Sequence, residues 1–237
     1  METGSLLKLH PPGATTHVVL LDIDGTLVDS NDAHARAWVG SLAEHGYVVQ
    51  FEDVRRLIGK GGDKLMPELT GLDPESDQAK AMSVLRAELF ARELPSLRPT
   101  RGARDLLVAL RDRGLQLVVA TSAMEEEVTV LLQQAGVADL IEAASSSDDA
   151  EASKPDPDII QAALRKVGRQ ASHSVMLGDT PYDVESAQRA RVPAIALRCG
   201  GWWGDDAFSN AIAIYDDPAD LLARLADSPL AHVGTAR

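Results

Sequence analysis

The decisive stretch of this sequence is HVVLLDIDGTLVD, residues 17–29. It opens with a short apolar run rich in Val and Leu, which is typical of a buried β-strand. The strand runs directly into Asp24-Gly25-Thr26, a combination that favours a turn. Asp22 and Asp24 therefore stand two positions apart at the carboxyl end of the strand, and their side chains are expected on the same side.

This pair of carboxylates indicates a functional site. Like charges at this spacing repel each other and raise the pKa of one of them unless a cation compensates. In open α/β sheets, ligands bind just beyond such strand ends. The pair therefore suggests a metal ion, a protonated partner, or both. A helix cap or a turn near Gly25 would explain either aspartate alone, but it does not explain the pair together with the motifs that follow.

Similar strand-and-helix units recur further along the chain. Strands are expected at 115–120, 174–177 and 193–197, with a weaker one near 140–143. Strands that alternate with helices predict parallel βαβ units, so the fold class is α/β with a doubly wound parallel sheet.

Residues 32–97 interrupt this alternation. They contain no convincing buried strand, but they do contain amphipathic helical patterns, for example at 76–94, and a proline-bearing connector follows at 94–99. We interpret 32–97 as a helical insert. The expected organisation is an N-terminal tail at 1–16, a core made of 17–31 and 98–237, and the helical insert between the two core segments.

Two polar motifs follow the next strand and a later loop. The hydroxyl of Thr121, at the end of the 115–120 strand, can hydrogen-bond a phosphate oxygen, although a helix cap made by Thr121 or Ser122 explains these hydroxyls equally well. Lys154 precedes a proline that restricts it to extended backbone. A fixed ammonium there can stabilise phosphoryl charge and keep a nucleophile ionised. The ordinary explanation of Lys154 alone is a solvated surface lysine.

The last motif, Gly178-Asp179-Thr180-Pro181-Tyr182-Asp183, follows the 174–177 strand. Its carboxylates can complete a site for Mg²⁺, which prefers oxygen ligands and keeps several waters. Helix capping would explain Asp183 alone. Together the four motifs supply a nucleophile, an acid and base, a hydroxyl, a cation and a metal site, which is the equipment for phosphoryl transfer through a carboxylate.

Composition limits the partners of the protein. The 237 residues include 23 Lys and Arg against 36 Asp and Glu, a net charge of -13. Such a surface repels nucleic acids and anionic membranes, so neither is expected as a partner. The single cysteine, Cys199, cannot form an internal disulfide. No signal peptide or membrane anchor is visible near the N-terminus, and a cytoplasmic location is expected.

Through these four motifs, the chain resembles the haloacid dehalogenase-like superfamily of hydrolases over roughly residues 17–226. The resemblance implies a Rossmann-like core in which Asp22 attacks the phosphorus atom. Asp24 would protonate the leaving alcohol and then deprotonate the attacking water, while Thr121 and Lys154 would orient and neutralise the phosphoryl group.

The resemblance also implies a cofactor. Mg²⁺ would be held by the Asp22 carboxylate, the backbone carbonyl of Asp24 and Asp179. Asp183 would support the loop or a metal-bound water. Asp24 itself favours phosphate esters over C–Cl or C–P bonds, because an alkoxide leaving group requires an acid.

The helical insert resembles the cap of the subgroup that contains phosphoglycolate phosphatase and β-phosphoglucomutase. Such a cap closes over the core and excludes water. Its loop IGKGGDK, residues 58–64, is expected to face the substrate, with Lys60 and Lys64 as candidates for contact with a substrate anion. A plain glycine-rich turn is an equal alternative. A Walker-type loop is excluded, because neither lysine is followed by Ser or Thr in the required glycine context.

The main functional prediction is a Mg²⁺-dependent phosphomonoester hydrolase, monomeric or homodimeric, that acts on a small phosphorylated metabolite through an aspartyl phosphate. The alternative is a phosphosugar mutase. It depends on the cap lysines and on His34, which lies where the mutase has a histidine and is a further candidate for substrate contact. An ordinary partly buried histidine explains His34 about as well. A non-catalytic phospho-accepting signalling module is a third possibility, disfavoured by the chain length, the insert and an acceptor on the first strand.

Overall fold

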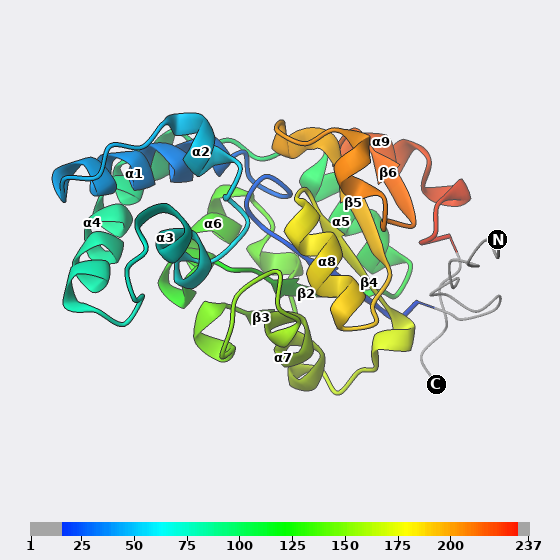
Figure 1. Ribbon diagram of the computed structural model, residues 1–237. Helices are drawn as coiled ribbons and strands as arrows, with labels where there is room; N and C mark the ends of the chain where they lie inside the picture. Colours follow the sequence, from blue (N-terminus) through cyan, green and yellow to red (C-terminus); the bar gives the residue numbers. More distant parts are fainter. Residues whose placement is uncertain (1–15, 232–237) are drawn as a thin grey trace, which may run out of the picture.

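The structure, a computed structural model, describes residues 16–231. Its core is a six-stranded sheet with the strand order β3-β2-β1-β4-β5-β6, in which all neighbouring strands are parallel (Figure 1). The predicted tail at 1–16 lies outside the described residues apart from Thr16. The strands are β1 Val18–Leu21, β2 Gln116–Ala120, β3 Ala143–Ser145, β4 Ser174–Gly178, β5 Ala194–Leu197 and β6 Ala213–Tyr215.

Helices cover both faces of this sheet. Successive side chains of a strand point to opposite faces, so Val19 and Leu21 of β1 enter one hydrophobic cluster while Val18 and Leu20 enter another. Helices α5, α6 and α9 complete the first cluster, and α7 and α8 complete the second. This arrangement confirms the predicted doubly wound α/β fold. The helices are α5 Ala103–Asp112, α6 Glu125–Gln134, α7 Asp158–Lys166, α8 Pro181–Arg189 and α9 Pro218–Ala223.

The predicted strands are found, with two differences at the sheet edges. β3 lies at 143–145, later in the chain than the expected 140–143. β6 was not predicted, because it has only three residues and lacks the continuous apolar run of the central strands. The central strand β1 ends at Leu21, so Asp22 is the first residue beyond it.

The helical insert has a hydrophobic cluster of its own. Its helices are α1 Asn31–Glu44, α2 Phe51–Arg55, α3 Gly62–Thr70 and α4 Asp77–Glu93, which lie together beside one end of the sheet (Figure 1). Trp38, Leu42 and Met82 are buried among these helices. Ala33 and Phe90 instead join the first cluster of the sheet, so the insert packs against the core.

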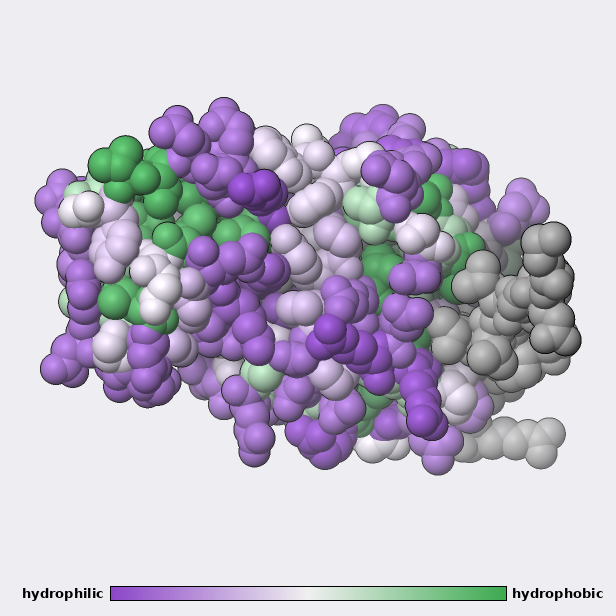
Figure 2. Space-filling model, in the orientation of Figure 1, coloured by the Kyte–Doolittle hydropathy of each residue, from purple (hydrophilic) through white to green (hydrophobic). Residues whose placement is uncertain are grey.

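The surface is largely hydrophilic on one face of the molecule. Most of the face drawn in Figure 2 is hydrophilic, with the largest hydrophobic area over the helical insert. Across residues 16–231, no helix has the length and apolar character needed to span a membrane.

Candidate active site

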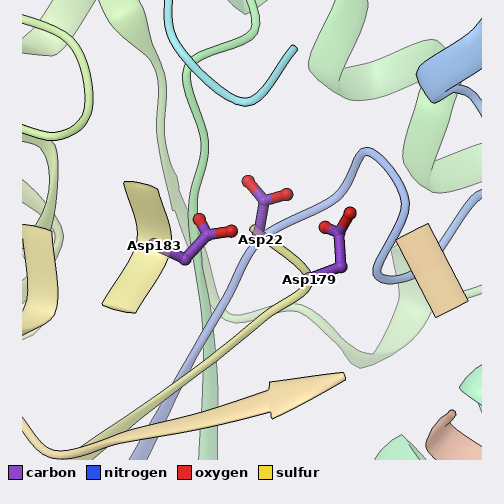
Figure 3. Close-up of side chains that lie close together, drawn as sticks. All are labelled: Asp22, Asp179 and Asp183. Carbon is purple, nitrogen blue, oxygen red and sulfur yellow. The ribbon is translucent and has the colours of Figure 1, made fainter. Parts of the chain in front are cut away.

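Three aspartates meet at the carboxyl edge of the sheet. Leu21 of β1 pairs in register with Leu177 of β4, so the residues just after the two strands are neighbours. Asp22 follows β1, Asp179 follows β4, and Asp183 lies in the first turn of α8. Carboxylate oxygens of the three lie within 4.8 Å of one another, and all three residues are buried (Figure 3).

Lys154 connects two of these aspartates. Its Nζ donates hydrogen bonds to Asp22 Oδ1 at 2.6 Å and to Asp183 Oδ1 at 2.7 Å, and the residue is 0 % exposed. The explanation of Lys154 as a solvated surface lysine is therefore wrong. Burial lowers the pKa of Lys154, but the charges of Asp183 and Asp22 outweigh it and raise the pKa above its usual value, so the ammonium stays charged.

Asp183 serves as a helix cap as well as a partner of Lys154. Its Oδ2 accepts hydrogen bonds from the backbone N–H of Thr180 at 3.0 Å and from the Thr180 hydroxyl at 2.7 Å. The two residues form a capping box at the start of α8. The capping explanation of Asp183 holds, and both of its carboxylate oxygens already have protein donors.

Asp179 is held by two donors from the segment that follows β1. The Thr26 hydroxyl donates to Oδ1 at 2.9 Å, and the Asn31 side-chain amide donates to Oδ2 at 2.8 Å. Two glycines make room for the carboxylate, because a Cβ on Gly25 or Gly200 would lie within 2.2 Å of Oδ2. Gly25 also has φ 76, which a residue with a side chain rarely adopts.

Asp24 lies beside the three-aspartate cluster and has its own partners. Its Oδ1 accepts from the Ser30 hydroxyl at 2.5 Å and lies 2.9 Å from His34 Nε2, and the His34 ring stacks on Phe90. Burial raises the pKa of Asp24. The charge and hydrogen bond of His34, the hydrogen bond from Ser30 and the charge of Arg86 outweigh burial, so the pKa is lowered.

The charge of the aspartate cluster is not balanced by Lys154 alone. Burial raises the pKa of Asp22 well above its ordinary value, against the lowering effect of Lys154 and with further raising by Asp183 and Asp179. Burial and Asp183 raise the pKa of Asp179 to about 7, despite the hydrogen bonds from Asn31 and Thr26. Closely spaced, buried oxygen donors with excess negative charge fit a divalent cation such as Mg²⁺.

A cavity of about 50 Å³ opens over the nucleophile candidate. Six residues predicted for the site line it, on both the sheet side and the side of the insert. They are Asp22, Asp24, His34, Lys60, Thr121 and Ser122. Lys154, which is also predicted to contact the phosphate, is not among the residues that line the cavity, but it donates a hydrogen bond to Asp22, which is.

The two cap lysines behave differently from each other. Lys60 lines the cavity, but its Nζ donates to Glu68 at 2.5 Å and lies 5.0 Å from the centre of the Tyr182 ring. Lys64 Nζ pairs with Asp156 at 2.7 Å, and the structure does not bring Lys64 to the cavity lining.

The hydroxyls at the end of β2 have different surroundings. Thr121 Oγ1 accepts a hydrogen bond from the backbone N–H of Ala123 at 3.1 Å. The N-cap of α6 is Met124, so the explanation of Thr121 or Ser122 as a helix cap is wrong. Ser122 Oγ is buried and has no hydrogen-bond partner in the described part of the chain.

The glycine-rich loop lies at the cavity and packs against the core. Residues 58–62 line the cavity, so the loop faces the site. A Cβ on Gly61 would lie 2.5 Å from Cβ of Ser153, so the close packing of insert and core also requires glycine there.

Several residues of the site escaped the sequence analysis. Asn31 is the first residue of α1, and its role beside Asp179 becomes visible only when the strand register brings the two residues together. Arg86 of α4 and Glu127 of α6 also line the cavity. No sequence pattern marks them, because Arg86 lies among other charges of an amphipathic helix and Glu127 ends a run of three glutamates.

The chain is similar in sequence to known phosphatases. The phosphoglycolate phosphatase of Rhodospirillum rubrum is 33 % identical over 212 residues, which cover 86 % of this chain and 88 % of that protein. Pyrophosphatase PpaX of Bacillus pumilus is 30 % identical, covering 75 % and 81 %.

Solved structures share the fold. A hydrolase from Pseudomonas syringae superposes with a TM-score of 0.83 at 28 % identity, covering 90 % of this chain and 99 % of that chain. A β-phosphoglucomutase from Clostridium difficile has a TM-score of 0.77 at 13 % identity, covering 87 % and 93 %, a likeness of fold alone. The sequence profile described as haloacid dehalogenase-like hydrolase matches residues 19–197, and the chain therefore belongs to this family.

Proposed function

We propose that the protein is a Mg²⁺-dependent phosphomonoester hydrolase in which Asp22 is the nucleophile and Asp24 the general acid and base. The class of enzyme, a phosphatase of small phosphorylated metabolites, follows from the family and from its phosphatase relatives. The observation that carries the assignment of roles is the bond from Lys154 to Asp22, at a cavity that Asp24 also lines.

The first half of the reaction transfers the phosphoryl group to the protein. A carboxylate oxygen of Asp22 attacks the phosphorus atom, the ester P–O bond breaks, and its electron pair stays on the leaving oxygen. Asp24 supplies the proton that turns this oxygen into an alcohol. The negative charge of a bound phosphate ester opposes the lowering of the Asp24 pKa in the ligand-free site and favours its protonated form. Ser30 and His34 orient the Asp24 carboxyl through Oδ1, which leaves Oδ2 to face the reacting atoms.

The second half restores the enzyme. Asp24, now a carboxylate, accepts a proton from a water molecule whose oxygen attacks the phosphorus of the aspartyl phosphate. The bond between phosphorus and the Asp22 oxygen breaks, and inorganic phosphate leaves. Lys154 offsets the negative charge at Asp22 in both halves, and the hydroxyls of Thr121 and Ser122 lie at the cavity where phosphoryl oxygens need donors.

The residues that would hold Mg²⁺ are Asp22, Asp179 and the backbone carbonyl of Asp24. Asp183 lies in the same cluster of carboxylates and supports this set through Lys154, the cation that it shares with Asp22. When bound, Mg²⁺ supplies positive charge beside the transferred phosphoryl group.

The substrate is a small phosphate monoester, and phosphoglycolate is the first candidate because several relatives are named for it. A mutase has less support, since Lys60 and Lys64, the proposed holders of a distal phosphate, pair with Glu68 and Asp156. The contact of His34 with Asp24 fits hydrolysis equally well. A cytoplasmic location and a monomeric or homodimeric state stay predictions.

The test is a panel of phosphorylated metabolites incubated with Mg²⁺ or with EDTA, with the products resolved by phosphorus NMR. We expect Mg²⁺-dependent inorganic phosphate, and a loss of turnover on the order of 10⁴-fold or more in Asp22→Asn. Asp29→Asn is the matched control, because Asp29 is exposed on the same segment. Undiminished turnover in Asp22→Asn would refute the proposal, and phosphate that moves between positions of a sugar would favour the mutase.

A further inference from the structure

An ion pair at the cavity joins the helical insert to the core. Arg86 lies on α4 and Glu127 on α6, and Arg86 Nη1 is 2.5 Å from Glu127 Oε1. Their side chains are 10 % and 11 % exposed. Both residues line the same cavity as Asp22 and Asp24. A guanidinium is therefore held beside the proposed reacting groups.

The orientation of this guanidinium is fixed by other contacts. Nη2 lies 3.7 Å from the sulfur of Met124, and the guanidinium carbon lies 5.5 Å from the centre of the Trp38 ring. A cation over an indole ring is attracted by the ring quadrupole. Glu127 binds one edge of the guanidinium and the Trp38 ring contacts it, so the fold fixes the direction of the N–H donor that remains.

That capacity is unused. Among the described residues, Arg86 Nε, Glu127 Oε2 and Ser122 Oγ are buried without a hydrogen-bond partner. Buried polar atoms nearly always have a partner, so three such atoms on residues that line one cavity indicate a polar ligand that completes them.

The position of Arg86 shows which part of a substrate it would meet. A second cavity of about 330 Å³ shares Trp38, Gly62, Arg86 and Ser122 with the cavity over Asp22. Arg86 thus lies in the wall common to the two spaces. A phosphoryl group beside Asp22 would leave the rest of the substrate, its leaving group, next to Arg86.

We propose that Arg86 is a specificity-determining residue that selects phosphate esters whose leaving group carries a second anionic group, above all a carboxylate. Its Nε–H, unpartnered within the described residues, can donate to a carboxylate oxygen, and its charge favours an anion. This inference rests on the phosphatase function proposed above and adds the substrate class to it.

Glu127 has a distinct part in this arrangement. In the free enzyme it compensates the buried charge of Arg86 and holds the guanidinium in place. Its own negative charge opposes a second anion in the cavity. Removal of that charge while the shape is kept is therefore expected to strengthen the preference for an anionic leaving group, whereas removal of the Arg86 charge abolishes the preference.

The experiment compares two esters of similar size, phosphoglycolate and 2-hydroxyethyl phosphate, which differ in the carboxylate. The measured quantity is the ratio of their kcat/KM values with Mg²⁺. The wild-type protein should prefer phosphoglycolate. Arg86→Gln should lower the ratio by roughly 10- to 100-fold, mostly through the KM of phosphoglycolate. Glu127→Gln should raise the ratio, and Arg92→Gln, an exposed arginine of the same helix, should leave it unchanged.

The double variant Arg86→Gln/Glu127→Gln keeps the test valid if the single Arg86 variant fails to fold, because it removes both buried charges together. It too should lose the preference for phosphoglycolate. A wild-type protein that prefers 2-hydroxyethyl phosphate, or a ratio that stays unchanged in the Arg86 variants, would overturn this inference and leave the phosphatase function standing. Absence of turnover for every ester of the panel would instead reject the phosphatase function itself.

Discussion

The edge of the sheet that carries Asp22, called the floor, and the cavity wall around Arg86 are built in opposite ways. On the floor, at the edge of the sheet, Asp179 and Asp183 each accept hydrogen bonds from named protein donors at both oxygens, and Lys154 holds Asp22. On the wall, Arg86 and Ser122 keep buried polar atoms without a partner in the described structure. The floor is organised before any ligand arrives, whereas the wall is completed by one.

This difference separates chemistry from recognition. Groups that must act on every phosphate ester gain from a fixed geometry that costs no reorganisation during the reaction. Groups that recognise the variable part of a substrate must leave hydrogen-bonding capacity for it. Substitutions on the floor should therefore change turnover or stability, and substitutions on the wall should change substrate preference.

After the loss expected for Asp22→Asn, the largest effect should come from a substitution of Asp24 on the floor. Asp24→Asn keeps an oxygen for Ser30 and His34 but cannot transfer protons, so kcat for an alkyl phosphate should fall by about 10²- to 10⁴-fold. With p-nitrophenyl phosphate, whose leaving group needs little protonation, the rate of the first step should fall less. Rapid quench followed by mass spectrometry should then detect an accumulated aspartyl phosphate. Equal losses for the two esters would argue against Asp24 as the acid.

The next effect concerns the stability of the floor. Lys154→Met leaves the carboxylates of Asp22 and Asp183 buried without their cation. The free energy of unfolding, measured in urea, should therefore fall by about 3–5 kcal/mol. Lys64→Met is the matched control. Its partly exposed pair with Asp156 should contribute no more than about 1 kcal/mol. Similar losses in the two variants would contradict the buried ion-pair network.

A smaller effect is expected from the metal. If the floor binds Mg²⁺, a concentration of 100 times the dissociation constant should stabilise the folded protein by about 2.7 kcal/mol and raise its melting temperature. The increase should be absent with Asp179→Asn, which removes a proposed ligand but keeps an acceptor for Thr26. An increase of the same size in that variant would place the metal elsewhere.

The smallest effect compares two hydroxyls directly. Thr26→Val removes a donor from the buried Asp179 carboxylate and should cost about 1–3 kcal/mol of unfolding free energy. Ser122→Ala removes a hydroxyl that has no partner within residues 16–231, so its cost should stay within about 0.5 kcal/mol. Thermal unfolding of both variants measures the difference. A larger cost for Ser122→Ala would erase the distinction between floor and wall.

Local patterns sufficed to predict the central strands and the motifs that follow them. Apolar runs of four to five residues form β1, β2, β4 and β5, and residues at their ends converge because parallel strands end at the same edge. β6 escaped because a three-residue edge strand carries too weak a pattern.

The sequence by itself determined the fold class, the run of helices between β1 and β2 and the aspartates at the strand ends, since each depends on neighbours along the chain. The tertiary structure alone decided that Lys154 is buried between Asp22 and Asp183, that Asn31 holds Asp179, and that Arg86 faces the cavity beside Glu127. These contacts join residues 29 to 148 positions apart. Such pairs are set by the register of the sheet and by the packing of the insert, which no local pattern records.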